Sequence, residues 1–265
     1  MQLTVLESLN ELTGIVSAKL WKRKTTRVRT IDGNVYVFKA AEDEAKGYCV
    51  AAGQRYKHEI IAYQIAQILG IYNVPETRVA TVKGRIGSLQ IYVMGSSAFR
   101  HKSLVERNKE LKKFDPEILA RCAAFDMLLG NSDRNRSNFF IIPRRDGPRL
   151  YLIDHGMILH SKSNIGHVGR VVRSAMKLKV PEEIQTWPSL WLTIKDVLRF
   201  HRIEKEFIDQ AYERLVILCQ HDTIGEAVAE WRKGQDNILG KVELAEENEE
   251  KETTPKTSSR GQSGK

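Results

Sequence analysis

Cysteine is scarce in this chain of 265 residues. Cys49, Cys122 and Cys219 are far apart, and no two of them form a Cys-x-x-Cys pair. An odd number of cysteines at such spacing predicts neither a disulfide framework nor a zinc site. We therefore expect a protein of a reducing compartment.

Long apolar runs are also missing from the sequence. No stretch approaches the roughly 18 apolar residues that a membrane-spanning helix needs. The first residues include Glu7 and Glu11, where a signal peptide would have an unbroken apolar core. The sequence therefore predicts no transmembrane segment and a cytoplasmic location.

Acidic residues are outnumbered by basic ones. The chain has 42 Lys and Arg against 33 Asp and Glu, which gives a formal net charge of +9. Such a charge favours an anionic partner but does not choose between nucleotide, phospholipid, acidic peptide and nucleic acid. The apolar fraction of 42%, taken together with the 18 glycines, is in the range of ordinary globular chains, which excludes fibrous classes.

The first hundred residues carry the signals of β-strands, and Asp32-Gly33-Asn34 is a strong tight-turn signal between two of them. One segment instead has apolar residues at helical spacing, with Gly70 as its stop. We expect strands at 18–22, 26–31, 35–40, 74–82 and 87–94, and a helix at 56–69.

The second half has a mostly helical texture, and its last segment is highly charged with no aliphatic side chain after Thr253. We expect helices at 116–129, 191–200, 204–219 and 223–231, and a hairpin made of 139–142 and 150–153. The sequence therefore predicts three parts: a β-rich unit at 1–97, a mostly helical unit at 98–240, and a disordered charged tail at 241–265.

The polar loop 130–138 is the most informative string. Asp133 and Asn138 lie five residues apart, directly before the first strand of the predicted hairpin, and Asp154 follows the second strand. Phosphoryl transfer needs a carboxylate near the acceptor hydroxyl and oxygen ligands for a divalent ion, and this pattern supplies both. Taken alone, the loop would equally suit Asx side chains that bind their own backbone.

The N-terminal half offers a second pair of candidates. Lys39 ends a predicted strand, and Glu59 lies 20 residues later in the predicted helix. A strand lysine held by a helix carboxylate is what a kinase uses to bind nucleotide phosphates. Individually, Lys39 would be an exposed strand-end cation and Glu59 an ordinary acid near a helix start. The kinase interpretation of Lys39 and Glu59 is favoured over these ordinary roles only when both residues are considered together with Asp133, Asn138 and Asp154.

In order and spacing, these residues resemble the kinase fold. Asp154-His155-Gly156 replaces Asp-Phe-Gly, and Asn131-Ser132 stands where His-Arg usually precedes the loop Asp. These departures make the chain similar to the atypical branch, the phosphatidylinositol 3-/4-kinase-like superfamily, related to HipA-type, actin-fragmin and Fam20 kinases. The resemblance implies an α+β, two-lobed protein-kinase-like fold with a small β-rich N-lobe and a mostly helical C-lobe.

The resemblance also implies the cofactors ATP and Mg²⁺ and a role for each motif residue. Asp133 is the catalytic candidate, and Asn138 and Asp154 are the metal ligands. His155 is expected to pack in the Phe position, and Arg134 is a candidate for neutralising transferred charge. The candidates for binding the nucleotide are Lys39, Glu59, Thr25 and Thr26 in the turn that replaces a glycine-rich loop, and Met94 in the expected hinge.

The acceptor is left open by the sequence. Segment 161–180 carries five cations and no carboxylate, which favours an acidic or phosphorylated substrate, either protein or lipid headgroup. We expect a protein Ser/Thr first, since the chain is short and lacks accessory lipid-binding modules. The alternatives are a phosphoinositide lipid kinase and a non-catalytic basic binding module on a kinase-like scaffold; nucleic acid is not favoured as a partner. Nucleotidyl transfer by the same residues also stays open.

Overall fold

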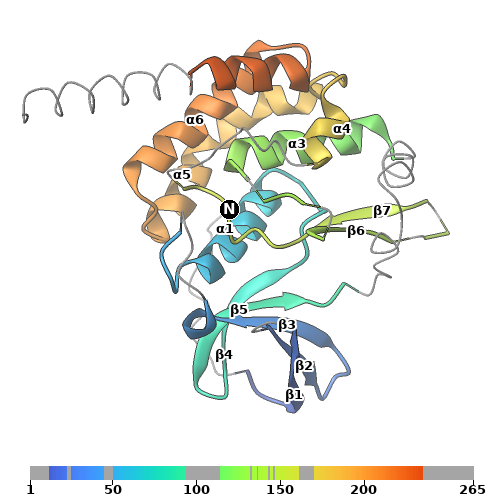
Figure 1. Ribbon diagram of the computed structural model, residues 1–265, viewed down its shortest axis with the longest axis vertical. Coiled ribbons are helices and arrows are strands. Elements are labelled where there is room, and N and C mark those ends of the chain that lie inside the picture. Colours follow the sequence, from blue (N-terminus) through green and yellow to red (C-terminus); the bar gives the residue numbers. More distant parts are fainter. Residues whose placement is uncertain are drawn as a thin grey trace, which may run out of the picture.

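The computed structural model describes residues 12–22, 25–44, 50–93, 114–131, 133–135, 137–142, 144–145, 147–160 and 170–234. The strands of the N-terminal part gather at one end of the molecule and most helices at the other, with helix α1 between them (Figure 1). This arrangement confirms the predicted α+β class with a β-rich N-lobe and a mostly helical C-lobe.

The N-lobe is built on a five-stranded antiparallel sheet in the order β1-β2-β3-β5-β4. The predicted turn joins β2 to β3, where the Asp32 carboxylate accepts a hydrogen bond from the Asn34 backbone at 3.3 Å and Gly33 adopts a φ of 83°. Pro75 cannot donate to a ladder, so the strand expected from residue 74 starts only at residue 77. The strands are β1 (Ile15–Lys22), β2 (Thr25–Thr30), β3 (Val35–Ala40), β4 (Thr77–Val82) and β5 (Arg85–Ile91).

The two faces of this sheet have different tasks. Residues directly opposite one another in an antiparallel pair share a face. One face carries a small apolar core that includes Val28, Phe38 and Leu89. Lys39 follows Phe38 in β3 and therefore points to the other face, toward α1 and the C-lobe. The alternation of β3 thus separates the core of the N-lobe from its functional face.

Helix α1 (Arg55–Ile68) confirms the predicted helix to within one residue at each end. The residue before it makes no side-chain cap. Instead, the Glu44 carboxylate accepts hydrogen bonds from the backbone of Arg55 at 2.8 Å and of Tyr56 at 2.6 Å. Glu44 follows the short 3₁₀ helix η1 (Ala41–Asp43), whose acids form ion pairs with Arg85 of β5. The helix start is therefore anchored from a distant part of the chain.

The C-lobe is mostly helical, as predicted. Helix α3 (Pro116–Leu129) is capped by Asp115, which accepts from the backbone of Glu117 at 2.8 Å, and Gly130 ends it with a φ of 63°. One large apolar core joins α1 to the C-lobe helices. The remaining elements are the hairpin β6 (Phe139–Ile142) and β7 (Arg149–Leu152), α4 (Arg170–Ala175), η3 (Glu182–Leu190), α5 (Trp191–Phe200), α6 (Lys205–Gln220) and a last helix at 224–234.

Some predictions fall outside the described residues. The expected lobe boundary at residue 97 and the tail 241–265 are among them, so the division into 1–97 and 98–240 stays a prediction. Within the described ranges, no helix has the length and apolar character to cross a membrane.

Candidate active site

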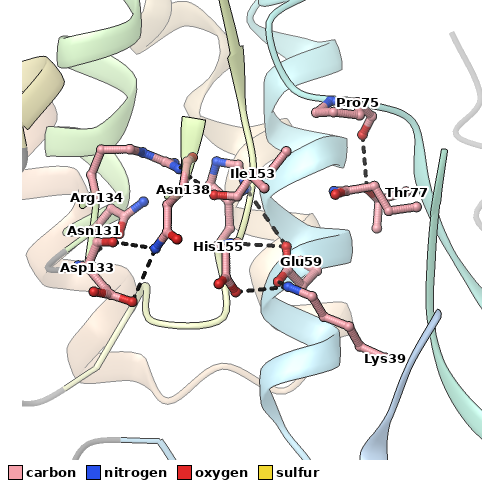
Figure 2. A network of polar contacts seen from close by, with 12 residues as sticks. Lys39, Glu59, Pro75, Thr77, Asn131, Asp133, Arg134, Asn138, Ile153 and His155 are labelled. Carbon is pink, nitrogen blue, oxygen red and sulfur yellow. Dashed lines mark hydrogen bonds and ion pairs between the residues drawn. The ribbon is translucent and has the colours of Figure 1, made fainter. Parts of the chain in front are cut away.

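Three predicted site residues meet in one charged cluster at the junction of the lobes. The ammonium group of Lys39, near the end of β3, forms ion pairs with the carboxylate of Glu59 in α1 and with Oδ1 of Asp154 at 2.8 Å. Figure 2 shows the Lys39 and Glu59 side chains directed toward one another. Lys39 and Asp154 are 115 residues apart in the sequence. The fold therefore brings together the two halves of the predicted site.

The members of this cluster differ in exposure. The side chain of Glu59 is 2% exposed, that of Lys39 29% and that of Asp154 50%. Burial alone would lower the pKa of Lys39, but Asp154 and Glu59 together raise it above its usual value. Lys39 in turn lowers the pKa of Asp154. Burial raises the pKa of Glu59, against the opposing effect of Lys39. At neutral pH, the exposed side of the cluster is thus a charged lysine beside a charged aspartate.

The backbone around Asp154 is held in an unusual conformation. Asp154 has a φ of 59°, in the left-handed region that few residues other than glycine, asparagine and aspartate adopt. The next amide, that of His155, donates to Oε2 of Glu59 at 3.0 Å. A Cβ on Gly156 would lie 3.3 Å from the Cβ of Arg55, so α1 approaches this segment closely. Glu59 therefore fixes both Lys39 and the segment that carries Asp154.

Asp133 and Asn138 lie together in the loop that the sequence singled out. The amide nitrogen of Asn138 donates to the backbone oxygen of Asp133 at 2.6 Å and to its Oδ2 at 3.2 Å (Figure 2). Asn135 donates to the other carboxylate oxygen at 2.9 Å. Because the Asn138 nitrogen is occupied in this way, its Oδ1 is the atom left to act as an acceptor or a ligand. The exposed Asp133 side chain is oriented before any substrate arrives.

The hairpin strands β6 and β7 position the two predicted metal ligands. Phe139 pairs with Leu152 in the β6–β7 hairpin, and the amide of Ile153 donates to the backbone oxygen of Asn138 at 2.9 Å. Asp154 is the next residue. An amide oxygen and a carboxylate fit Mg²⁺, which usually takes few protein oxygens and completes its coordination with waters and substrate phosphates. No cluster of three or more His, Cys, Asp or Glu suited to a metal occurs in the described part of the chain.

Arg134 has a different role from the predicted one. Its side chain is fully buried, and it forms two hydrogen bonds of 2.9 Å with the Asp126 carboxylate of α3. Its Nη1 donates to the backbone oxygens of Asn138, at 2.5 Å, and Ile153 (Figure 2). A guanidinium occupied in this way is not available to a transferred phosphoryl group. Arg134 instead ties the loop of Asp133 to the strand end that carries Asp154.

His155 packs in the interior, as the sequence predicted. It is fully buried and meets the ring of Phe125 edge-on, with 6.1 Å between the ring centroids. Burial, and then the nearby charges of Arg134 and Lys39, hold the pKa of His155 well below its usual value. A neutral packing side chain is therefore in the position after Asp154.

The remaining predicted residues differ in whether they share the sheet face of Lys39 and in whether they lie within the described residues. Thr25 lies opposite Lys39 and shares its face, whereas Thr26 lies opposite Phe38 and faces the other side of the sheet. Met94 and residues 161–169 lie outside the described residues. In the described part of segment 161–180, Arg173, Lys177 and Lys179 are exposed.

Two important residues were missed by sequence reasoning. Asp126 is a carboxylate within the apolar second half of helix α3, which is a signal that a buried partner is required. Glu44 caps α1 from 11 residues upstream, and no local pattern in the sequence marks such a distant cap.

Comparisons with known proteins support the fold. No family model and no curated protein matches this chain. Among solved structures, hydra Fam20 with sugar matches with 13% identity and a TM-score of 0.51, over 84% of this chain and 86% of that chain. The Golgi casein kinase with Mn/ADP bound matches with 13% identity and a TM-score of 0.52, over 82% and 74%. The finer phosphatidylinositol 3-/4-kinase-like assignment stays a prediction. The chain therefore has an atypical protein-kinase-like fold.

Proposed function

We propose that this protein is an ATP-dependent phosphotransferase that moves the γ-phosphoryl group to a hydroxyl, with a protein Ser/Thr as the first candidate acceptor. The observation that carries the proposal is the bridge that Lys39 makes between Glu59 and Asp154. A cation for phosphates and a carboxylate for a metal are thereby adjacent. The solved structure of the Golgi casein kinase with Mn/ADP bound supports nucleotide and divalent metal use in this fold.

Each side chain has a task in this proposal. Lys39, held by Glu59, binds and orients the α- and β-phosphates. Asn138 and Asp154 hold Mg²⁺, which when bound supplies positive charge to the phosphates. Asp133 orients the acceptor hydroxyl and takes its proton as the oxygen bonds to the γ-phosphorus and ADP leaves. Most of the rate enhancement then comes from positioning and electrostatic stabilisation.

The ion pair between Lys39 and Asp154 is a resting arrangement in this proposal. Half of the Asp154 side chain is exposed, so its carboxylate is accessible to an incoming cation. Nucleotide phosphates offer Lys39 a new partner, and the metal offers one to Asp154. Both charges therefore keep a counter-charge when the pair separates, which lowers the cost of separation.

The charge of the surface in segment 161–180 indicates the class of the acceptor. Arg173, Lys177 and Lys179 are exposed in the described part of segment 161–180, which favours an acidic or phosphorylated substrate. A protein segment is our first candidate, and a phosphoinositide headgroup is the alternative. A panel of acidic peptides and phosphoinositide vesicles with γ-labelled ATP separates them, since label in lipid but in no peptide would reverse this order.

The test of the reaction uses Asp154→Asn, because asparagine also tolerates the left-handed backbone. We expect metal-dependent transfer of label to fall by about 100-fold or more, while the unfolding transition is retained. The control is Asp209→Asn, which removes an exposed carboxylate of α6. Transfer at the wild-type rate in Asp154→Asn would contradict the metal role. Mass spectrometry after incubation with ATP distinguishes a gain of phosphate from a gain of AMP.

The alternative of another class is a binding module without catalysis. Its supporting observation is the excess of basic charge. Thermal unfolding with MgATP separates the two, because a ligand at about 100 times its Kd adds about 2.7 kcal/mol of stability. No shift with MgATP, together with a salt-sensitive shift with DNA, would favour the binding module.

A further inference from the structure

A basic surface lies on α4 and the residues that follow it. Its members are Arg173, Lys177 and Lys179, whose side chains are all exposed, and we call it the α4 basic surface. Within the described residues, neither Lys177 nor Lys179 forms an ion pair. By contrast, Lys205 and Lys233 pair with carboxylates of their own helices at 3.0 and 3.2 Å. The two lysines of the α4 basic surface therefore remain open to an acidic partner.

The last helix, at 224–234, starts directly beside this surface. Lys179 forms an isolated antiparallel bridge with Thr223. The Gly225 amide donates to the backbone oxygen of Met176 at 2.9 Å, and a Cβ on Gly225 would lie 2.5 Å from that oxygen. Glu226, an acid in the first turn of this helix, accepts from the Thr223 amide at 2.9 Å and so caps the helix. The chain therefore leaves the α4 basic surface through a helix whose start is fixed to it.

The sequence beyond this helix has the opposite charge. Segment 243–252 contains six glutamates and one lysine, whereas segment 161–180 contains five cations and no carboxylate. The helix at 224–234 rises about 16 Å, and residues 235–242 reach up to about 26 Å when fully extended. The second length exceeds the first. The tether is therefore long enough to return the glutamates to the surface from which the helix departs.

We propose that the glutamates of segment 243–252 dock on the α4 basic surface of the same chain. A tethered partner has an effective concentration in the millimolar range, so a set of weak charge pairs is enough to hold it. Exposed ion pairs are individually weak and are screened by salt, so a stronger anion displaces the segment. Resting on the proposed function, in which this surface binds an acidic acceptor, the docked segment competes with that acceptor. The chain then regulates the access of substrates to its own active site.

The first measurement is carbodiimide cross-linking of the full chain at low ionic strength, because this reagent joins a lysine amine to a carboxylate only when the two are in contact. Peptide mapping by mass spectrometry identifies the products. We expect links from segment 243–252 to Lys177 and Lys179, at a yield that is independent of protein concentration and is lost in high salt. The matched control is Lys83, an exposed lysine in the turn between β4 and β5, to which we expect no link.

The second measurement is the transfer of label to an acidic peptide. Changing all six glutamates of segment 243–252 to glutamine removes the competing charge. We therefore expect the KM for the peptide to fall about three- to tenfold, with kcat and the affinity for MgATP unchanged. Changing the same six residues to aspartate keeps the charge and should leave the KM at its wild-type value.

Each other result has a definite meaning. Absence of links from the segment to Lys177 and Lys179, or equal links to Lys83, would overturn the docking. Links whose yield rises with protein concentration would assign the segment to a second copy and also overturn it. An unchanged peptide KM in the glutamine variant would overturn the competition. A wild-type protein that transfers label to no acceptor overturns the proposed function instead, and the cross-links, which need no transfer, still decide the docking.

Discussion

Two aspartates near the candidate active site each pair with a cation, but their surroundings differ. Asp126 and its partner Arg134 are fully buried, with two hydrogen bonds between them. Asp154 is half exposed, and its partner Lys39 is shared with Glu59. The first pair is closed to ligands and holds two segments together. The second is open to solvent and can exchange partners. The difference separates a residue that supports the site from one that we propose acts in it.

The largest expected effect is on the buried pair. Asp126→Asn would leave Arg134 charged and without its counter-charge in the interior, so we expect the free energy of unfolding to fall by about 3–5 kcal/mol. Asp154→Asn is the matched change at the exposed pair, and there we expect a loss of at most about 1 kcal/mol. Urea unfolding of both variants measures the contrast. Similar losses in the two variants would remove the distinction drawn above.

We expect an intermediate loss of stability from a change at Gly87, where the backbone of β5 lies close to that of Lys39. A Cβ on Gly87 of β5 would lie 2.1 Å from the backbone oxygen of Lys39. Gly87→Ala should therefore displace β3 and cost about 1–3 kcal/mol of stability, with weaker MgATP binding. Gly234→Ala is the control, because a Cβ there meets nothing within 4 Å. Unchanged unfolding in Gly87→Ala would show that the open pair does not depend on this close approach.

The smallest effect concerns pH and the open pair. Lys39 lowers the pKa of Asp154 below 3.8. The folded state therefore binds that proton less readily than the unfolded state. The resulting stability is present above the ordinary pKa and is lost as pH falls through the lowered one. Because Asp154 is half exposed, we expect less than about 1 kcal/mol. Urea unfolding of the wild type and Asp154→Asn below about pH 5 measures it. A wild-type curve that declines no more steeply than that of Asp154→Asn would contradict this.

The sequence was sufficient for most of the strands and helices, although not for α4 and η3, and for most of the charged cluster. β-turn chemistry and helical periodicity located the strands and helices because those signals are local. Lys39, Glu59 and Asp154 were found because the kinase pattern that the sequence resembles has these three residue types in a fixed order. We could therefore predict from the sequence alone that these three side chains lie close together.

Other features depend on contacts that no local pattern records. Arg134 was assigned to the substrate because it follows Asp133, but its partner is on α3. Thr25 and Thr26 were grouped together, although strand alternation allows only one of them to share the face of Lys39. The contact of the Arg27 guanidinium with the Tyr92 ring joins segments that are far apart in the sequence. The first relation follows from the packing of the loop against α3, and the other two follow from strand register. All three require knowing which segments are neighbours in the fold.

The capping of α1 by Glu44 has a consequence for how this chain tolerates change. Two of the first-turn amides are satisfied by one carboxylate that lies before residues 45–54, so that stretch does not itself need to supply a capping side chain. An insertion there that pulled Glu44 away would loosen the first turn and, with it, the placement of Glu59 one turn later.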